Sequence, residues 1–349
     1  MVLVMLLTLY SGSMAFAATI VVDPPKNYQV ADIGYDGNGN WYANLTWQFG
    51  TFPPGTDEGQ FIASFHEIEY GTGRRITNSV QMTIPGTQRG RVVYDDYDPE
   101  INPDSNALKP GHIYESNLIA ACSVVDTNDR VLSQRSNVIK FITGVRFHAE
   151  LIPGTNDIKI SWDDVWDTNG RIDYRIYISD ISDQSFVPIT ETIRGARIGQ
   201  PDSPPVTINA AERKLEYIFT GAHPGRMYSI KVVPIPGPDV VVVPEAEIPE
   251  IPVNTNILIR AYRVGYTPDG DAIWNLVWDP VIIDENIKQR NYYLFRYTSK
   301  DDNNPKQYVL PDITSYQIIV PKGDTTPYSF SVEARVITAN NRTLEFKSG

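Results

Sequence analysis

The chain has 349 residues, of which 42% are hydrophobic, and this is enough apolar material for several independent cores. Its 26 prolines and 24 glycines interrupt the sequence often, which favours short strands joined by turns over long helices. The formal net charge of −12 argues against binding to nucleic acid or to an anionic membrane surface.

The N-terminus resembles a secretory signal. The apolar run Val2–Leu9 is too short to cross a bilayer, and the small-residue pattern Ala15-Phe16-Ala17 that follows is typical of a signal-peptidase site. We therefore expect residues 1–17 to be a signal peptide and the mature protein to be secreted or displayed at the cell surface. No lysine or arginine precedes the run, which departs from the usual pattern. No later apolar stretch is long enough to span a membrane.

Three tryptophans recur at an almost constant interval. Trp47, Trp162 and Trp278 lie 115 and 116 positions apart, and each ends a strand-like run that follows a turn of Gly, Asn, Asp or Pro residues. Self-similarity at a fixed period indicates one structural module repeated along the chain. The sequence therefore predicts three copies of one module.

Each copy also contains a turn that leads into a strand headed by tyrosine. Tyr114 and Tyr228 follow turns that contain Pro-Gly, whereas Tyr328 follows the looser turn Lys322–Pro327. Beyond each tyrosine the apolar residues alternate with polar ones, which indicates a strand with one face in a core. A tyrosine that heads such a strand and bonds back to the preceding backbone is the tyrosine corner of β-sandwiches.

One stretch of the second copy resembles the fibronectin type III family in particular. The run Tyr217–Tyr228, Y-I-F-T-G-A-H-P-G-R-M-Y, is similar to that family's strand E, turn and strand F, and the three tryptophans match its strand B. The resemblance implies an all-β fold of three tandem immunoglobulin-like (fibronectin type III) β-sandwiches, in an exported surface protein that we expect to be bacterial. The family is a generic extracellular building block, so the resemblance specifies no ligand.

The repeat divides the chain into domains. We expect domain 1 at residues 18–143, domain 2 at 144–244, a Pro-rich linker at 245–256 and domain 3 at 257–349. The valine run Val240–Val243 is expected to supply the last strand of domain 2. The prolines that follow it predict an extended, semi-rigid spacer between domains 2 and 3.

The third copy stops one strand short of the first. When Asn340 is aligned with Asn128, Ser348 matches Ser136 and nothing corresponds to the strand Asn137–Phe141. We therefore expect domain 3 to lack its last strand, either because the sequence is a fragment or because the domain is open. An unpaired strand and an uncovered core invite a strand from another molecule.

An acidic cluster lies in an insertion between strands E and F of the first copy. The candidate binding residues are Asp95, Asp96, Asp98, Glu100 and Asp104. Carboxylates at this density can hold Ca²⁺, which takes six to eight oxygen ligands. The alternative is a solvated acidic loop, since surface loops tolerate such insertions. Calcium is the one cofactor that the sequence suggests.

Trp41 and Trp274 raise the question of a sugar-stacking platform. Side chains two residues apart share a face of a strand, so Trp41 shares a face with Trp47, and Trp274 shares one with Trp278. Along these faces the order Trp41, Ala43 in the first copy corresponds to Ala272, Trp274 in the third, so the large and small residues have exchanged places. Such an exchange keeps the volume of a core constant. We therefore expect both residues to pack in cores.

The sequence lacks the motifs of common enzymes. Its four histidines are scattered, and it contains no G-x-S-x-G, no glycine-rich phosphate loop and no cysteine with a plausible base. We therefore expect a protein with no catalytic residues.

Three functions fit these patterns. The first is a non-catalytic structural or adhesive array of fibronectin type III-like modules in a cell-surface or secreted assembly. The second is a carbohydrate or cell-wall binding appendage of a larger enzyme, with cell-wall glycan as its partner. The third is a filament subunit that assembles by strand exchange, for which Ala18–Asp23 is a candidate donor strand. The expected partners are proteins, or further copies of the chain that associate through sheet edges.

Overall fold

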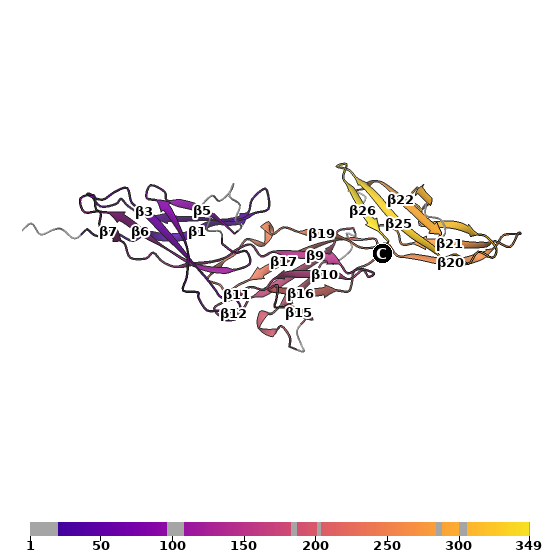
Figure 1. Cartoon of the computed structure of the whole chain (residues 1–349), viewed down its shortest axis with the longest axis horizontal. Coiled ribbons are helices and arrows are strands. Elements are labelled where there is room, and N and C mark those ends of the chain that lie inside the picture. The colour runs from indigo at the N-terminus through magenta and orange to yellow at the C-terminus, as the bar shows by residue number, and fades with distance from the viewer. Residues whose placement is uncertain are drawn as a thin grey trace, which may run out of the picture.

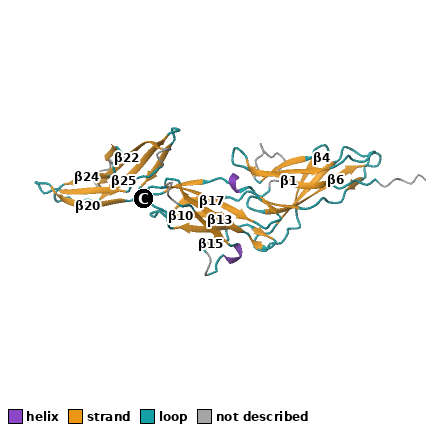
Figure 2. Ribbon diagram, turned by 180° about the vertical axis from the view of Figure 1, so that it is seen from behind, coloured by secondary structure: helices purple, strands orange, loops and turns teal. Residues whose placement is uncertain are grey.

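The computed structural model describes most of the chain, namely residues 20–95, 108–182, 187–200, 204–283, 288–299 and 306–348. Strands and loops make up these residues, apart from two short 3-10 helices at Gly195–Arg197 and Glu245–Glu247 (Figure 2). The sheets follow one another along the axis of an extended molecule (Figure 1). The prediction of an all-β chain is therefore confirmed. Within the described residues, no helix is long and apolar enough to cross a membrane.

The first unit consists of two facing sheets around a core that contains Trp41, Trp47 and Tyr114. One sheet has the strands β1 (Lys26–Tyr35), β2 (Trp41–Gln48) and β5 (Gly90–Tyr94). The other has β3 (Gln60–Glu67), β4 (Val80–Pro85), β6 (Ile113–Ser123), β7 (Arg130–Leu132) and β8 (Ile139–Ile142). Burial alternates along β2, because successive side chains of a strand point to opposite faces.

The second unit has the same two-sheet arrangement around Trp162 and Tyr228. Its first sheet has the strands β9 (Phe147–Leu151), β10 (Ile158–Asp163), β15 (Val206–Asn209) and β16 (Lys214–Phe219). Its second sheet has β13 (Asp173–Asp180), β14 (Ile189–Ile193), β17 (Met227–Ile235) and β19 (Ile251–Asn254). A short hairpin of β11 (Trp166–Asp167) and β12 (Gly170–Arg171) joins the two sheets.

The third unit repeats the pattern around Trp278. One sheet has the strands β20 (Ile259–Tyr266), β21 (Ala272–Trp278) and β24 (Ser315–Val320). The other has β22 (Lys288–Ser299), β23 (Lys306–Leu310), β25 (Tyr328–Thr338) and β26 (Thr343–Lys347). Among the residues that the structure describes, the buried hydrophobic side chains therefore form three clusters, one between each pair of sheets. Trp274, predicted as a core residue, is only partly buried and packs against the third cluster.

The repeated tryptophans lie at equivalent places in the three cores. Trp47, Trp162 and Trp278 are 4%, 0% and 1% exposed, and each lies near the end of the central strand of the sheet that carries it. Trp41 is 1% exposed and stacks on Phe141 with the ring centroids 5.9 Å apart. Trp41 is therefore a core residue, as predicted, and presents no face to a sugar.

Two of the three tyrosines form tyrosine corners. The Tyr114 hydroxyl accepts a hydrogen bond from the Lys109 backbone N–H at 2.9 Å, and the Tyr228 hydroxyl accepts one from the His223 N–H at the same distance. The third differs, because the Tyr328 hydroxyl donates to the Asp324 carboxylate at 2.7 Å. The looser turn before Tyr328 thus replaces a backbone contact by a side-chain one.

The segment predicted as a valine strand and a spacer has a different structure. Val240–Val241 forms β18, which pairs in parallel with β8 of the first unit rather than completing the second. The last strand of the second unit is β19, which pairs with β17 inside the predicted linker at residues 245–256. The prediction was wrong because the apolar side chains between the prolines are buried. Val243 and Ile248 are both 6% exposed and pack in the first core.

The predicted match between Ser348 and Ser136 is seen in the hydrogen bonds. Ser136 N–H donates to the Leu118 carbonyl at 2.8 Å and its hydroxyl accepts from the Leu118 N–H at 2.9 Å. Ser348 makes the same pair of bonds with Val332, at 2.8 and 3.1 Å. The strands β7 and β26 therefore occupy equivalent positions beside the tyrosine-headed strands β6 and β25.

Candidate functional site

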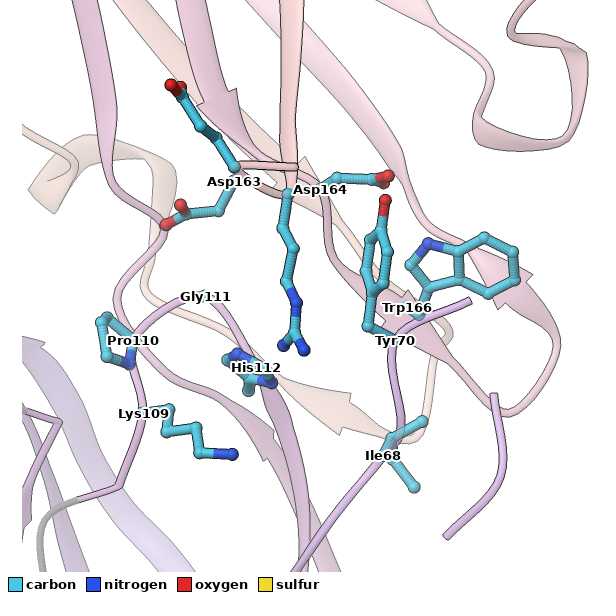
Figure 3. Close-up of a pocket in the computed structure, with 11 residues that line it drawn as sticks. Ile68, Tyr70, Lys109, Pro110, Gly111, His112, Asp163, Asp164 and Trp166 are labelled. Carbon is cyan, nitrogen blue, oxygen red and sulfur yellow. The ribbon is translucent and has the colours of Figure 1, made fainter. Parts of the chain in front are cut away.

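A polar pocket of about 240 Å³ lies where the first unit meets the second. Figure 3 shows side chains of both units around it, with Lys109 and His112 from the first and Asp163, Asp164 and Trp166 from the second. The first unit contributes the turn that precedes its tyrosine corner. The second contributes the residues that directly follow its core tryptophan. The two repeated landmarks of the sequence thus meet at this junction.

The Pro-Gly turn brings the backbones of the two units into contact at Gly111. Its φ of +68° is a conformation that glycine adopts without strain, and a Cβ at this position would lie 2.7 Å from the Asp163 Cβ. Gly225 occupies the same place in the turn before Tyr228. Its φ is +67°, and a Cβ there would lie 2.6 Å from the Pro280 carbonyl oxygen of the third unit. Both junctions therefore require glycine, first because the φ is positive and second because a Cβ would collide with the next unit.

We expect Gly111→Ala to destabilise the protein by more than about 1 kcal/mol, because alanine is strained at this φ and its Cβ collides with Asp163. Chemical unfolding followed by circular dichroism measures the loss. Gly154→Ala is the matched control, since Gly154 has a φ of +77° but a Cβ added there would meet no atom within 4 Å. If both variants lost the same free energy of unfolding, the close contact between Gly111 and Asp163 would contribute nothing to the cost of the substitution.

A buried threonine lies beside each junction, and its hydrogen bonds stay within one unit. The Thr143 hydroxyl accepts from the His112 N–H at 2.9 Å and donates to the Lys109 carbonyl at 2.8 Å. The Thr255 hydroxyl makes the same two contacts in the next junction, with the Arg226 N–H at 2.8 Å and the His223 carbonyl at 2.7 Å. Both threonines are 1% exposed. Each ties the end of a unit's last strand to the turn before its tyrosine.

On the first-unit side of the pocket, one carboxylate binds two basic side chains. Glu67 contacts the Lys109 ammonium at 2.8 Å and the His112 Nδ1 at 3.1 Å. Burial alone would raise the pKa of Glu67, but the hydrogen bonds from His112 and Lys109 outweigh it and lower the pKa to about 2. Glu67 is therefore a fixed anion that orients the turn carrying Gly111.

The depressed pKa of Glu67 predicts a loss of stability in acid. Its contribution is complete above the ordinary pKa of 4.5 and is lost as the pH falls from there towards about 2, because the protonated form binds the two bases poorly. Urea unfolding of the wild-type protein and of Glu67→Gln should therefore differ more at pH 7 than at pH 3. Glu150→Gln serves as the control, since the Glu150 side chain is 56% exposed. A difference in the free energy of unfolding between wild type and Glu67→Gln that is the same at pH 7 and pH 3 would contradict the prediction.

On the second-unit side, two carboxylates are also neutralised. Asp163 accepts from the Arg146 N–H at 2.7 Å and pairs with Lys214. Asp164 accepts two hydrogen bonds from Arg171, at 2.6 Å from Nε and 2.9 Å from Nη2. Such bidentate pairs hold both side chains in one geometry. Both carboxylates are therefore held by basic partners within the second unit.

Aromatic contacts fill the remaining wall of the pocket. Tyr70 of the first unit meets Trp166 of the second edge-on, with the ring centroids 6.0 Å apart. Arg171 lies over Trp166 and Arg213 lies over Tyr70, each at 5.2 Å. Burial raises the pKa of the Tyr70 hydroxyl, and the nearby Asp164 carboxylate raises it further. The junction is thus held by ion pairs and by edge-on and cation–π aromatic contacts together.

The acidic cluster predicted as a binding loop is described at one position. Asp95 is 7% exposed, and its carboxylate accepts from the Gly144 N–H at 2.9 Å, so it supports the connection between the first two units. Asp96, Asp98, Glu100 and Asp104 lie outside the described residues. Among the residues that the structure describes, no group of three or more His, Cys, Asp or Glu side chains could hold a metal ion. Calcium binding by this loop stays a prediction.

Sequence reasoning missed Gly111, Thr143 and their counterparts in the second junction. A signal was present, because Pro-Gly precedes both Tyr114 and Tyr228, but it was interpreted only as a turn. The matching threonines were hidden, because the last strand of the second unit was placed at Val240–Val243.

The comparisons with known proteins do not place the chain in a family. No protein-family model and no curated protein matches the sequence. Among solved structures, the FN1–FN3 domains of chicken CNTN1 match 94% of this chain over 99% of theirs, with 13% identity and a TM-score of 0.24. A segment of two fibronectin type III domains from chicken tenascin matches 67% of this chain over 100% of its own, with 18% identity and a TM-score of 0.30. TM-scores this low carry no argument, so the architecture rests on the sheets and tyrosine corners described above.

Proposed function

We propose that the chain is a non-catalytic array of three tandem fibronectin type III-like domains that acts as a stiff spacer or adhesive stalk in a cell-surface or secreted assembly. We place the domains at residues 18–143, 144–256 and 257–349, so that β19 belongs to the second. The observation that carries the proposal is the repeated junction. The same glycine contact occurs where the first unit meets the second and where the second meets the third, and in both places a threonine of the preceding unit holds the turn that carries the glycine.

Apolar side chains cross the first junction in both directions. Ile68, Ile113 and Ile142 of the first unit are 1%, 0% and 1% exposed and belong to the second core. In return, Val233 and Val243 belong to the first core. Burying one such side chain contributes roughly 1.5–3 kcal/mol relative to leaving it in water. Bending at this junction would expose several of them, which supports a stiff connection.

The second junction is built on fewer contacts of the same kind. Met227 is 7% exposed and packs in the third core, next to the Gly225 turn. The Gly225 carbonyl accepts from the Ile282 N–H at 3.0 Å, and Asn254 Nδ2 donates to the Glu345 carbonyl at 3.2 Å. Backbone groups are less mobile than long side chains, so these bonds restrict the orientation of the third unit.

Distances between spin labels on different units test the proposal. Labels at Gln134→Cys and Thr207→Cys span the first junction, and labels at Thr207→Cys and Ile319→Cys span the second, all in a Cys122→Ala background. A stiff array gives one narrow distance distribution for each pair. Broad distance distributions across both junctions would mean that the three domains reorient independently of one another, and this would overturn the spacer function.

A further inference from the structure

The polar pocket between the first and second units contains hydrogen-bond donors that the fold leaves without partners. Its volume of about 240 Å³ is smaller than that of pockets that hold drug-sized molecules, so it suits a small ligand. Part of its wall is apolar, because Ile68 and Pro110 also line it. The donors come from both units, and each is described in turn below.

Arg213 of the second unit supplies the strongest donor. Its guanidinium lies over the Tyr70 ring at 5.2 Å and lines the pocket, and within the described part of the chain it forms no ion pair or side-chain hydrogen bond. Arg213 has a φ of +54°, a conformation that residues other than glycine rarely adopt, and its carbonyl is held by the Asp164 N–H at 2.9 Å. Backbone strain of this kind is concentrated at binding sites. The fold therefore holds an unpaired cation at the pocket at some cost to itself.

Two ring nitrogens at the pocket also lack partners among the described residues. The Trp166 Nε1 is buried and makes no hydrogen bond, and Figure 3 shows it on the edge of the indole that faces Tyr70. Core tryptophans share this property, but Trp166 lies at a pocket that a ligand can enter. His112 uses Nδ1 to bind Glu67 at 3.1 Å, so its Nε2 can donate to a ligand when the ring is protonated. A buried N–H without an acceptor is costly, so an acceptor brought by a ligand is favoured.

Most of the carboxylates around the pocket are already bound by cations. Three of them form ion pairs: Glu67 with Lys109, Asp163 with Lys214, and Asp164 with Arg171. The fourth, Glu212, lies at an exposed position of the wall. The hydrogen-bonding capacity that remains free is therefore mainly that of donors, and it suits a ligand group that only accepts.

We propose that this pocket binds a small organic carboxylate, with the anionic group at the Arg213 guanidinium. The two groups match as a planar pair that forms two parallel hydrogen bonds. Lys109 of the first unit adds a second positive charge, and its side chain is 64% exposed. The hydrocarbon part of the ligand packs against Ile68 and Pro110. Because Arg213 and Lys109 belong to different units, the bound anion connects the first unit to the second.

The second junction has a different set of side chains at the equivalent positions. Counted from the core tryptophans, Ile282 takes the position of Trp166 and Pro280 takes that of Asp164. Neither side chain carries a hydrogen-bond donor. The carboxylate site therefore belongs to the first junction alone, although the two junctions share their glycine turn.

Benzoate is the probe, titrated into the full chain at low ionic strength, where charge interactions are least screened. The nuclear magnetic resonance signal of the Trp166 Nε1–H, identified by its loss in Trp166→Phe, should shift and saturate as benzoate binds. Benzamide has nearly the same shape without the charge and should bind roughly tenfold more weakly. Equal binding of the two compounds, or no saturation at concentrations on the order of 50 mM, would overturn the proposal.

Three protein variants locate the site. Arg213→Gln should weaken benzoate binding roughly tenfold, and Glu212→Gln should strengthen it, because the opposing charge is removed. Both positions are exposed, so neither change empties a core. Arg194→Gln removes an arginine whose side chain is 67% exposed in the same unit, and it should leave binding unchanged. Equal weakening by Arg213→Gln and Arg194→Gln would mean that benzoate responds only to net charge, and this would overturn the site.

Inorganic phosphate separates an organic carboxylate from oxyanions in general. Phosphate has no hydrocarbon part to pack against Ile68 and Pro110, so it should bind more weakly than benzoate. Phosphate binding as tight as that of benzoate would overturn the assignment to a carboxylate. Anion binding does not require a stiff array, so the distances between spin labels test the spacer function separately.

Discussion

Trp162→Ala is expected to lower the free energy of unfolding by about 3–5 kcal/mol, which is the usual cost of emptying a buried tryptophan site. Trp162 is 0% exposed and meets Tyr174 edge-on at 5.6 Å in the middle of the second core. That core also holds Ile113 and Ile142 from the first unit, so the cavity weakens the first junction as well. Urea unfolding, followed by near-ultraviolet circular dichroism, measures the loss.

Trp166→Ala provides the comparison for Trp162→Ala. Trp166 belongs to the same unit but is only partly buried, and at the junction it meets Tyr70 edge-on and lies under Arg171. We expect a smaller loss, because less apolar surface leaves a buried environment. If the two variants lost the same free energy, the second core would not be the main source of stability in this unit.

Asp164→Asn is expected to cost about 3 kcal/mol, because it leaves the Arg171 guanidinium without its anion in a largely buried site. The Asp164 side chain is 0% exposed and that of Arg171 is 13% exposed. Thermal and chemical unfolding at neutral pH measure the effect. Breaking one member of a buried pair is costly even where the intact pair adds little net stability.

Two further variants separate the buried pair from ion pairs in general. Arg194→Ala breaks the exposed pair with Asp173, whose side chains are 67% and 28% exposed, and should cost only about 0–1 kcal/mol. The double variant Asp164→Leu with Arg171→Met should recover most of the loss of Asp164→Asn, since it removes both charges together. A double variant less stable than Asp164→Asn would contradict this account.

The strands and core landmarks could be predicted because their signals are local. Strand-like runs were predicted to end at Trp47 and Trp162, and β2 and β10 form there with both tryptophans buried. The match between Ser348 and Ser136 came from aligning two turns, and the same two hydrogen bonds form in both places. Where one short segment decides the structure, the sequence was sufficient.

The last strand of the second unit could not be predicted in the same way. Valine favours strands in any sheet, so the run at Val240 did not specify which sheet would accept it. Pro252 argued against a strand at Ile251–Asn254, since proline cannot donate to a ladder. It is tolerated because β19 is an edge strand. Which edges are open depends on the whole fold, and no local pattern records it.

The junction residues required knowledge of distant contacts. Asp95 was predicted to lie in a solvated or calcium-binding loop, yet its carboxylate holds the backbone of Gly144 at the connection between units. Gly111 meets Asp163 only because the second unit returns to the turn after its tryptophan strand. The spacing of residues along the sequence predicts which positions of the three modules are equivalent, but it does not predict which residues of neighbouring modules are in contact.

The pairing of β18 with β8 has a mechanical consequence. The chain leaves the second unit after β17, attaches to the first unit through Val240–Val241, and returns along β19 towards the third. A pulling force between the outer units therefore has two routes, one through the sheets of the second unit and one through this attachment. The middle unit is shielded until β18 detaches. Under force, the detachment of β18 from β8 would then give a short extension before any of the β-sandwiches unfolds.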